Sequence, residues 1–152
     1  MLKLEYLPPC RELVEFVSAY YHFIMDEDHL DDFERSDIAQ LRFNFKGNGR
    51  IEFPKASGFE IPRYGLYGPR MTFSKVIATG PLHVIGAGIL PVAWSALTGL
   101  PADKYINTVV DAELFFGPEL VTVAEAGRVA GEQGNFQAAV DGIDAFLLSR
   151  VK

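Results

Sequence analysis

Apolar and polar residues alternate along much of the first two thirds of the chain, the pattern of strands that bury one face. Residues 41–45 follow this alternation, residues 46–49 interrupt it with glycine and asparagine, and residues 50–53 resume it. The pattern predicts a hairpin with an Asn-Gly turn. Its core-facing side chains are expected to be Leu41, Phe43, Phe45, Ile51 and Phe53.

Further strands are expected on both sides of this hairpin. Residues 18–25 are rich in aromatic side chains and predict a strand that follows a short helical turn at 11–16. Glycine or proline bounds three more predicted strands, at 64–67, 74–78 and 83–90. Short strands separated by turn residues are typical of a barrel or a sandwich.

The period of the apolar residues changes in the last third of the chain. Pro101 and Pro118, each followed by an acidic residue within the first turn, predict two helix starts. Asn135 is expected to cap a final amphipathic helix. Its apolar stripe repeats at steps of three and four residues and consists of Phe136, Val140, Ile143, Leu147 and Val151.

The stripe on the final helix has two interpretations. It either forms the interface of a homodimer or closes over the sheet of the same molecule. The fold class predicted from all these elements is α+β, an antiparallel barrel-like (cupin-like) sheet followed by a helical C-terminal third. We expect a single domain over residues 1–152, with residues 1–100 mainly β and residues 101–152 helical.

Composition and charge narrow the function classes. Apolar residues make up 49% of the chain and charged residues 22%, values typical of one packed globular domain. The formal net charge is −6, so the averaged field repels phosphate, and we expect the chain by itself not to bind duplex DNA. The longest apolar run, residues 84–94, is shorter than the roughly 20 residues that span a bilayer. We therefore expect a soluble protein with no membrane partner.

Cys10 is the only cysteine, so no intrachain disulfide can form and a reducing cytoplasm is the expected location. The same residue is a weak candidate for a catalytic nucleophile, because no histidine lies near it in sequence. Ser95 lacks the flanking glycines of a nucleophile elbow. We therefore expect no catalytic residues and do not expect an enzyme.

Two glycines at 86 and 88 suggest the loop of a dinucleotide site, but Pro91 stands where the third glycine is needed and no crossover helix follows. We interpret residues 84–91 as a glycine-kinked strand and expect no cofactor.

Metal binding is not expected either. His22, His29 and His83 are far apart in sequence, and none has a second histidine two to four residues away. Residues 26–32 are acidic but lack the glycine that a calcium loop needs, so a solvated acidic loop is expected there.

The polar residues of the predicted 41–45 strand are candidates for a ligand site. Arg42 and Asn44 alternate with the core-facing residues and must share the opposite face of the strand. If that face lines a lumen, a buried arginine needs a partner, which an anionic or carbonyl-bearing ligand would supply. Aromatic residues that are candidate walls are Tyr20, Tyr21, Tyr64, Tyr67 and Trp94.

We therefore expect Tyr21, Arg42, Asn44 and Trp94 to bind the ligand. The alternative is that the aromatic residues belong to an ordinary core and the arginine lies in solvent.

Six short segments occur in a characteristic order along the chain. They are Tyr-Leu-Pro-Pro at 6–9, Leu-Arg-Phe-Asn-Phe at 41–45, Gly-Leu-Tyr-Gly-Pro-Arg at 65–70, Val-Ile-Gly-Ala-Gly-Ile-Leu-Pro at 84–91, Leu-Thr-Gly-Leu-Pro-Ala at 97–102 and Asp-Ala-Glu-Leu-Phe-Phe-Gly at 111–117. In their order and spacing, the chain resembles the N-terminal effector-binding and dimerisation domain of AraC-type (AraC/XylS) transcription regulators. Two turns depart from the family pattern, at residues 35–37 and 92–93.

The resemblance implies the sensor domain of a bacterial transcription regulator, which binds a small-molecule effector and forms a homodimer. DNA would be bound only through a helix-turn-helix domain that is not present in this chain. The alternative function is a small barrel-type enzyme or isomerase acting on a hydrophobic molecule. Titratable residues that converge on the cavity would favour the enzyme, and an aromatic pocket without them would favour the sensor.

Overall fold

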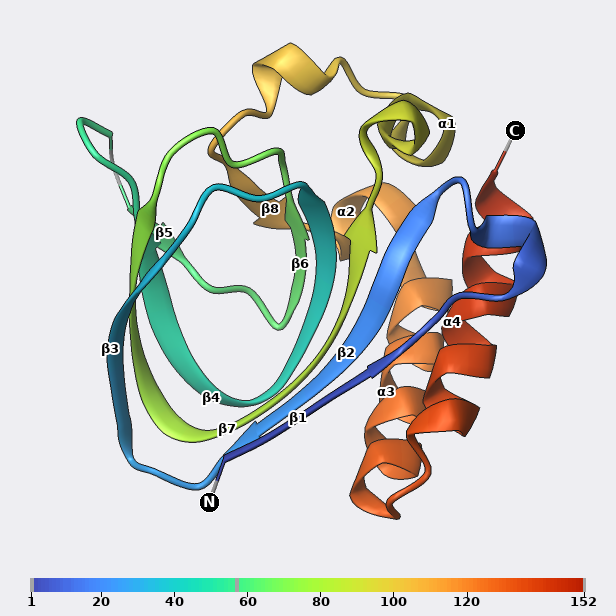
Figure 1. The fold of residues 1–152 in the computed structure, drawn as a ribbon, viewed down its shortest axis with the longest axis horizontal. Coiled ribbons are helices and arrows are strands. Elements are labelled where there is room, and N and C mark those ends of the chain that lie inside the picture. The colour runs from blue at the N-terminus through green and yellow to red at the C-terminus, as the bar shows by residue number, and fades with distance from the viewer. Residues whose placement is uncertain (1, 57, 152) are drawn as a thin grey trace.

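A computed structural model, which describes residues 2–56 and 58–151, has an α+β fold with one antiparallel sheet (Figure 1). The strand order is β1-β2-β7-β4-β6-β8, while β3 pairs with β7 and β5 with β4. This order ends at β1 and β8, so the sheet is open. The eight strands are β1 (Leu2–Leu7), β2 (Val17–Met25), β3 (His29–Glu34), β4 (Ala39–Glu52), β5 (Phe59–Glu60), β6 (Tyr64–Tyr67), β7 (Ser74–Ile89) and β8 (Val109–Asp111).

The two longest strands, β4 and β7, pair along almost their whole lengths and curve together (Figure 1). The predicted hairpin at 41–53 is therefore wrong, because both halves of β4 pair with β7 and not with each other. The Asn-Gly segment produces register shifts between Asn44 and Asn48, and Gly47 adopts a φ of +83°. Likewise, the two strands predicted at 74–78 and 83–90 are one strand, and the predicted acidic loop continues into β3.

The register shift in β4 moves its apolar residues from one face of the sheet to the other. Asn44 pairs with Val84 before the shift, and Ile51 pairs with Val76 after it, so the alternation along β4 has slipped by one residue. All five predicted core residues of this segment are buried, as expected. However, they contribute to two clusters: Leu41, Phe43 and Phe45 to one, and Ile51 and Phe53 to the other.

Helices cover the outer face of the curved sheet near β2 and β7 (Figure 1). Asn135 caps the last helix as predicted, since its Oδ1 accepts a hydrogen bond from the Ala138 N–H at 3.1 Å. The helix start predicted at Pro101 gives only a three-residue 3-10 turn.

None of the described helices is long and apolar enough to span a membrane. The helices are α1 (Trp94–Thr98), α2 (Glu113–Phe116), α3 (Pro118–Glu132) and α4 (Phe136–Arg150), with 3-10 turns at Arg11–Leu13, Pro91–Ala93 and Ala102–Lys104.

The apolar stripe of α4 packs inside the molecule. Phe136, Val140, Ile143 and Leu147 are each at most 5% exposed and belong to the cluster between the helices and the sheet. The stripe therefore closes over the sheet of the same molecule, and its interpretation as a dimer interface is wrong. One buried carboxylate ties the same helix to the sheet: Asp144 accepts hydrogen bonds from the Tyr20 hydroxyl at 2.7 Å and the Cys10 N–H at 3.1 Å.

Two glycines in different surroundings, one in the bulge of β4 and one in α4, should respond in opposite ways to substitution by alanine. Gly47→Ala should destabilise the fold by about 2 kcal/mol or more, because its φ is positive and the new methyl would lie 2.6 Å from the Thr79 carbonyl oxygen. Gly142→Ala, in α4 with open space around it, should stabilise the fold by up to about 1 kcal/mol. Urea unfolding measures both, and a Gly47→Ala variant as stable as the wild type would contradict this account of the bulge.

Candidate functional site

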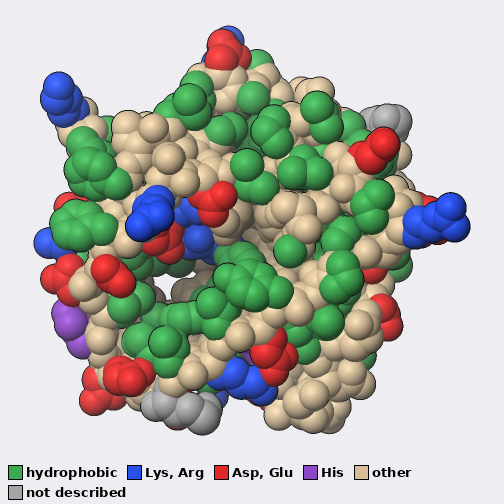
Figure 2. Space-filling model, in the orientation of Figure 1, with side chains coloured by type: hydrophobic (Ala, Val, Ile, Leu, Met, Phe, Trp, Pro, Cys, Tyr) green, Lys and Arg blue, Asp and Glu red, His purple; other side chains and the backbone are tan. Residues whose placement is uncertain are grey.

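A cavity of about 480 Å³ lies on the inner face of the curved sheet, opposite the helices. Figure 2 shows the surface hollowed within the curl of β4 and β7, with charged side chains beside the opening. One part of the wall is apolar and the other is polar. The apolar part includes Leu4, Phe23, Leu30, Leu82 and Val84, and the polar part includes Glu34, Asp37, Gln40, Arg42, Asn44 and Arg70.

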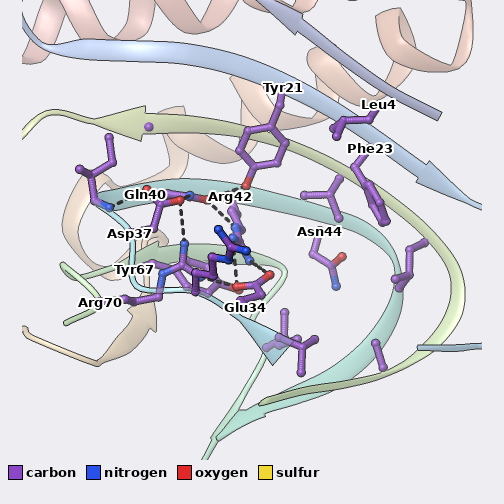
Figure 3. Close-up of a pocket in the computed structure, with 18 of the residues that line it drawn as sticks. Leu4, Tyr21, Phe23, Glu34, Asp37, Gln40, Arg42, Asn44, Tyr67 and Arg70 are labelled. Atoms are coloured by element: carbon purple, nitrogen blue, oxygen red, sulfur yellow. Dashed lines mark hydrogen bonds and ion pairs between the residues drawn. The ribbon is translucent and has the colours of Figure 1, made fainter. Parts of the chain in front are cut away.

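Tyr21 crosses the cavity wall from one strand to another. It stands on β2, opposite Gly86 on β7, and its hydroxyl donates a hydrogen bond of 2.7 Å to Gln40 Oε1 on β4 (Figure 3). A Cβ at position 86 would collide with the Tyr21 ring. Because Gly86 has no side chain, the Tyr21 ring can lie across β7, which gives this glycine a structural role.

A network of charged and polar side chains forms the polar end of the cavity, next to the Tyr21 hydroxyl (Figure 3). Glu34 lies between two arginines: its carboxylate is 3.4 Å from Arg42 Nη1 and also bonds Arg70 Nη1. Arg70, whose side chain is only 2% exposed, continues to Asp37 at 3.4 Å. Gln40 joins the two ends, since its Nε2 donates to Asp37 at 3.0 Å and its Oε1 accepts from Arg42 Nε at 2.7 Å.

The formal charges of this cluster cancel, because two arginines face two carboxylates. Burial by itself would raise the pKa of Glu34, but the attraction of Arg42 and Arg70 outweighs burial and leaves that pKa below its ordinary value. Burial raises the pKa of Tyr21 to about 12. Both groups therefore keep their ordinary protonation at neutral pH, with Glu34 ionised and the Tyr21 hydroxyl neutral.

Arg42 faces the cavity, as the alternation predicted, but its partners come from the protein. Besides Glu34 and Gln40, the guanidinium lies over the ring of Tyr67, 4.6 Å from its centroid. The expectation that this arginine needs a ligand to supply its partner is therefore wrong. Asn44 is the more available polar group: its Nδ2 has only a long contact of 3.5 Å to the Gly47 carbonyl oxygen.

Three of the four predicted ligand residues, Tyr21, Arg42 and Asn44, line the cavity. The fourth, Trp94, does not: it is 2% exposed in the cluster beneath the helices and stacks near Tyr105, with ring centroids 5.9 Å apart. The chain leaves the sheet at the end of β7 before it reaches Trp94, so this tryptophan packs outside the cavity.

The other aromatic candidates divide between the two faces of the sheet. Tyr67 lines the cavity, whereas Tyr20 and Tyr64 bond Asp144 and Glu125 of the helices. Sequence reasoning missed Gln40, although it shares the alternation of Arg42 and Asn44. Glu34, Asp37 and Arg70 carry no local signal, because they come from other segments that only the fold brings together.

A second buried polar pair lies on the helix side of the sheet. His22 and His83 are 2% and 4% exposed, and their Nε2 atoms form a hydrogen bond of 2.8 Å. Gly131 of α3 packs directly over the pair. The two histidines are thus far apart in sequence but adjacent in space. Among the described residues, no three His, Cys, Asp or Glu side chains gather in a way that could hold a metal ion.

No protein-family model matches this chain, and a search of curated proteins finds no match to it.

The histidine pair predicts a loss of stability in mild acid. Burial, and next the neighbouring His22, lower the pKa of His83 to about 4, and burial also lowers the pKa of His22. An unfolded histidine titrates near 6.5, so between pH 6.5 and 4 the unfolded chain binds more protons and the fold loses stability as pH falls. We expect the free energy of unfolding to drop by about 2 kcal/mol from pH 7 to 5 through His83.

Denaturant unfolding at a series of pH values measures this slope. His83→Gln should make it shallower, and His29→Gln, at an exposed histidine of β3, should leave it unchanged. An equal slope in the wild type and His83→Gln would show that the pair does not titrate as described.

Proposed function

We propose that this chain is a ligand-sensing and dimerisation domain of a bacterial transcription regulator, built on an incomplete barrel-like sheet. The observation that carries the proposal is the cavity, which has an apolar wall and one polar end. The resemblance of the motif order to AraC-type sensor domains supports the same function. In this proposal DNA is bound by a separate helix-turn-helix domain.

The paired cluster at the polar end favours a neutral ligand over an anion, and the one other arginine in the lining, Arg35, is exposed. An anionic group would compete with Glu34 for Arg42 and Arg70, which are already paired with carboxylates. A neutral polar group can instead exchange hydrogen bonds with the amide of Asn44, while an apolar body fills the space near Phe23 and Leu82. We therefore propose a small amphipathic molecule without net charge.

The position of β4 offers a route from the ligand to the helices. Its side chains alternate between the cavity, where Arg42 lies, and the cluster beneath the helices, where Leu41 and Phe43 lie. A ligand that favours one position of β4 would also favour one packing of the helices on the sheet. Such a difference in affinity for two states is what a sensor requires.

The second candidate is an enzyme acting on the same kind of molecule, and one observation favours it. Titratable residues do converge on the cavity, as an enzyme would require. Their protonation favours the sensor, because general acid–base catalysis works best with groups whose pKa lies near the operating pH. Glu34 and Tyr21 are shifted away from neutrality.

A cavity-filling substitution should weaken the binding of a neutral aromatic probe. We expect N-phenylnaphthylamine fluorescence to report binding to the wild type, and Asn44→Trp, whose side chain would project into the cavity, to weaken it at least about tenfold. Lys46→Trp adds the same ring to an exposed position of the same strand outside the cavity and should bind the dye as the wild type does. Equal binding by the two variants would place the dye elsewhere.

Native mass spectrometry of the purified protein separates the sensor from the enzyme. A small molecule that copurifies with the wild type but not with Asn44→Trp should raise the melting temperature when returned to the empty protein, and should be recovered unchanged. Recovery of a chemically altered molecule would support the enzyme instead. When the chain is fused to a helix-turn-helix domain, the affinity of the fusion for operator DNA should change on addition of that molecule. An affinity that is the same with and without the molecule would contradict the regulatory role.

A further inference from the structure

The strand β1 forms one edge of the sheet and is open to solvent. It pairs only with β2, so one side of its backbone lacks a strand partner among the described residues. Leu2, Leu4 and Tyr6 are apolar yet 64%, 50% and 64% exposed. An open edge with apolar side chains is a surface on which another strand can pair.

The charges of β1 lie on its other face. Lys3 and Glu5 alternate with the apolar residues, and their side chains form an ion pair of 2.8 Å. β1 therefore has one apolar face and one face that carries a single positive and a single negative charge. A partner strand must therefore place apolar side chains beside the apolar face and opposite charges beside Lys3 and Glu5.

A second copy of β1 matches both faces in only one antiparallel register. Residues directly opposite each other share a face, so the two apolar faces coincide only when the pairing is centred on a residue. Centring on Lys3 would oppose two lysines, and centring on Glu5 would oppose two glutamates. Centring on Leu4 places each lysine opposite the glutamate of the other copy, with Leu2 opposite Tyr6.

We propose that two copies of this chain pair edge to edge through β1, in the antiparallel register centred on Leu4, and form one continuous sheet. The pairing joins the backbone groups that β1 leaves open, creates two cross-strand Lys–Glu pairs and covers the exposed leucines. Since Leu4 and Tyr6 also line the cavity, the partner strand lies beside the cavity of each copy. The interface does not involve the stripe of α4, which is buried in each copy.

Charge reversal tests the register directly. Lys3→Glu gives the charged face two acids, and Glu5→Lys gives it two bases, so each variant would oppose like charges at two places in its own dimer. Sedimentation or light scattering over a concentration series should show a wild-type dimer, and each single variant should dissociate with a Kd at least about tenfold higher. The double variant Lys3→Glu/Glu5→Lys restores opposite charges and should dimerise as the wild type does.

Mixing the two single variants tests most directly whether residue 3 of one copy lies opposite residue 5 of the other. In a mixed pair every acid of the Lys3→Glu chain faces a base of the Glu5→Lys chain, so heterodimers should form from two preparations that are each mainly monomeric. Lys75→Glu is the matched control: it makes the same charge change at an exposed ion pair of β7 and should remain dimeric. A monomeric wild type at several hundred micromolar or single variants as dimeric as the wild type would overturn the proposal, and so would a mixture that stays monomeric.

Discussion

The pairing of β4 with β7 is the constraint on which the rest of the structure depends. Two strands of 14 and 16 residues stay paired through a change of register, and the shift exchanges the faces on which β4 places its apolar side chains. One half of β4 thereby supports the cluster beneath the helices, and the other half supports the cluster around the inner face. Without the shift, the residues beyond it would point to the opposite faces of the sheet.

The cavity depends on this pairing because its polar end is assembled across strands. Tyr21 reaches Gln40 only because Gly86, on the strand between them, has no side chain. Gln40 then orients Arg42, and Glu34 holds that arginine and Arg70 together. Opposite charges that pair in this way fix one another's positions, so the polar end of the cavity is ordered by contacts within the protein, and the formal charges of Glu34, Asp37, Arg42 and Arg70 balance.

The sequence by itself determined the elements whose signals are local. Alternation placed Arg42 and Asn44 on the face opposite Leu41, Phe43 and Phe45, because successive side chains of a strand point to opposite sides. The cap at Asn135 and the helix after it were predicted from a side-chain type and a period. The motif order of the chain also suggested a sensor domain, a function that remains a proposal.

Only the tertiary structure decided which elements meet. Residues 46–49 carry the turn signal of a hairpin, yet a bulge forms because both halves of β4 find their partner in β7. The stripe of α4 fits a dimer interface and a core equally well, and the sheet beneath it settles the choice. Glu34 and Arg70, or His22 and His83, become partners through contacts between distant segments. Local sequence patterns do not predict such contacts, because periodicity indicates which face of an element is buried but not which other element covers that face.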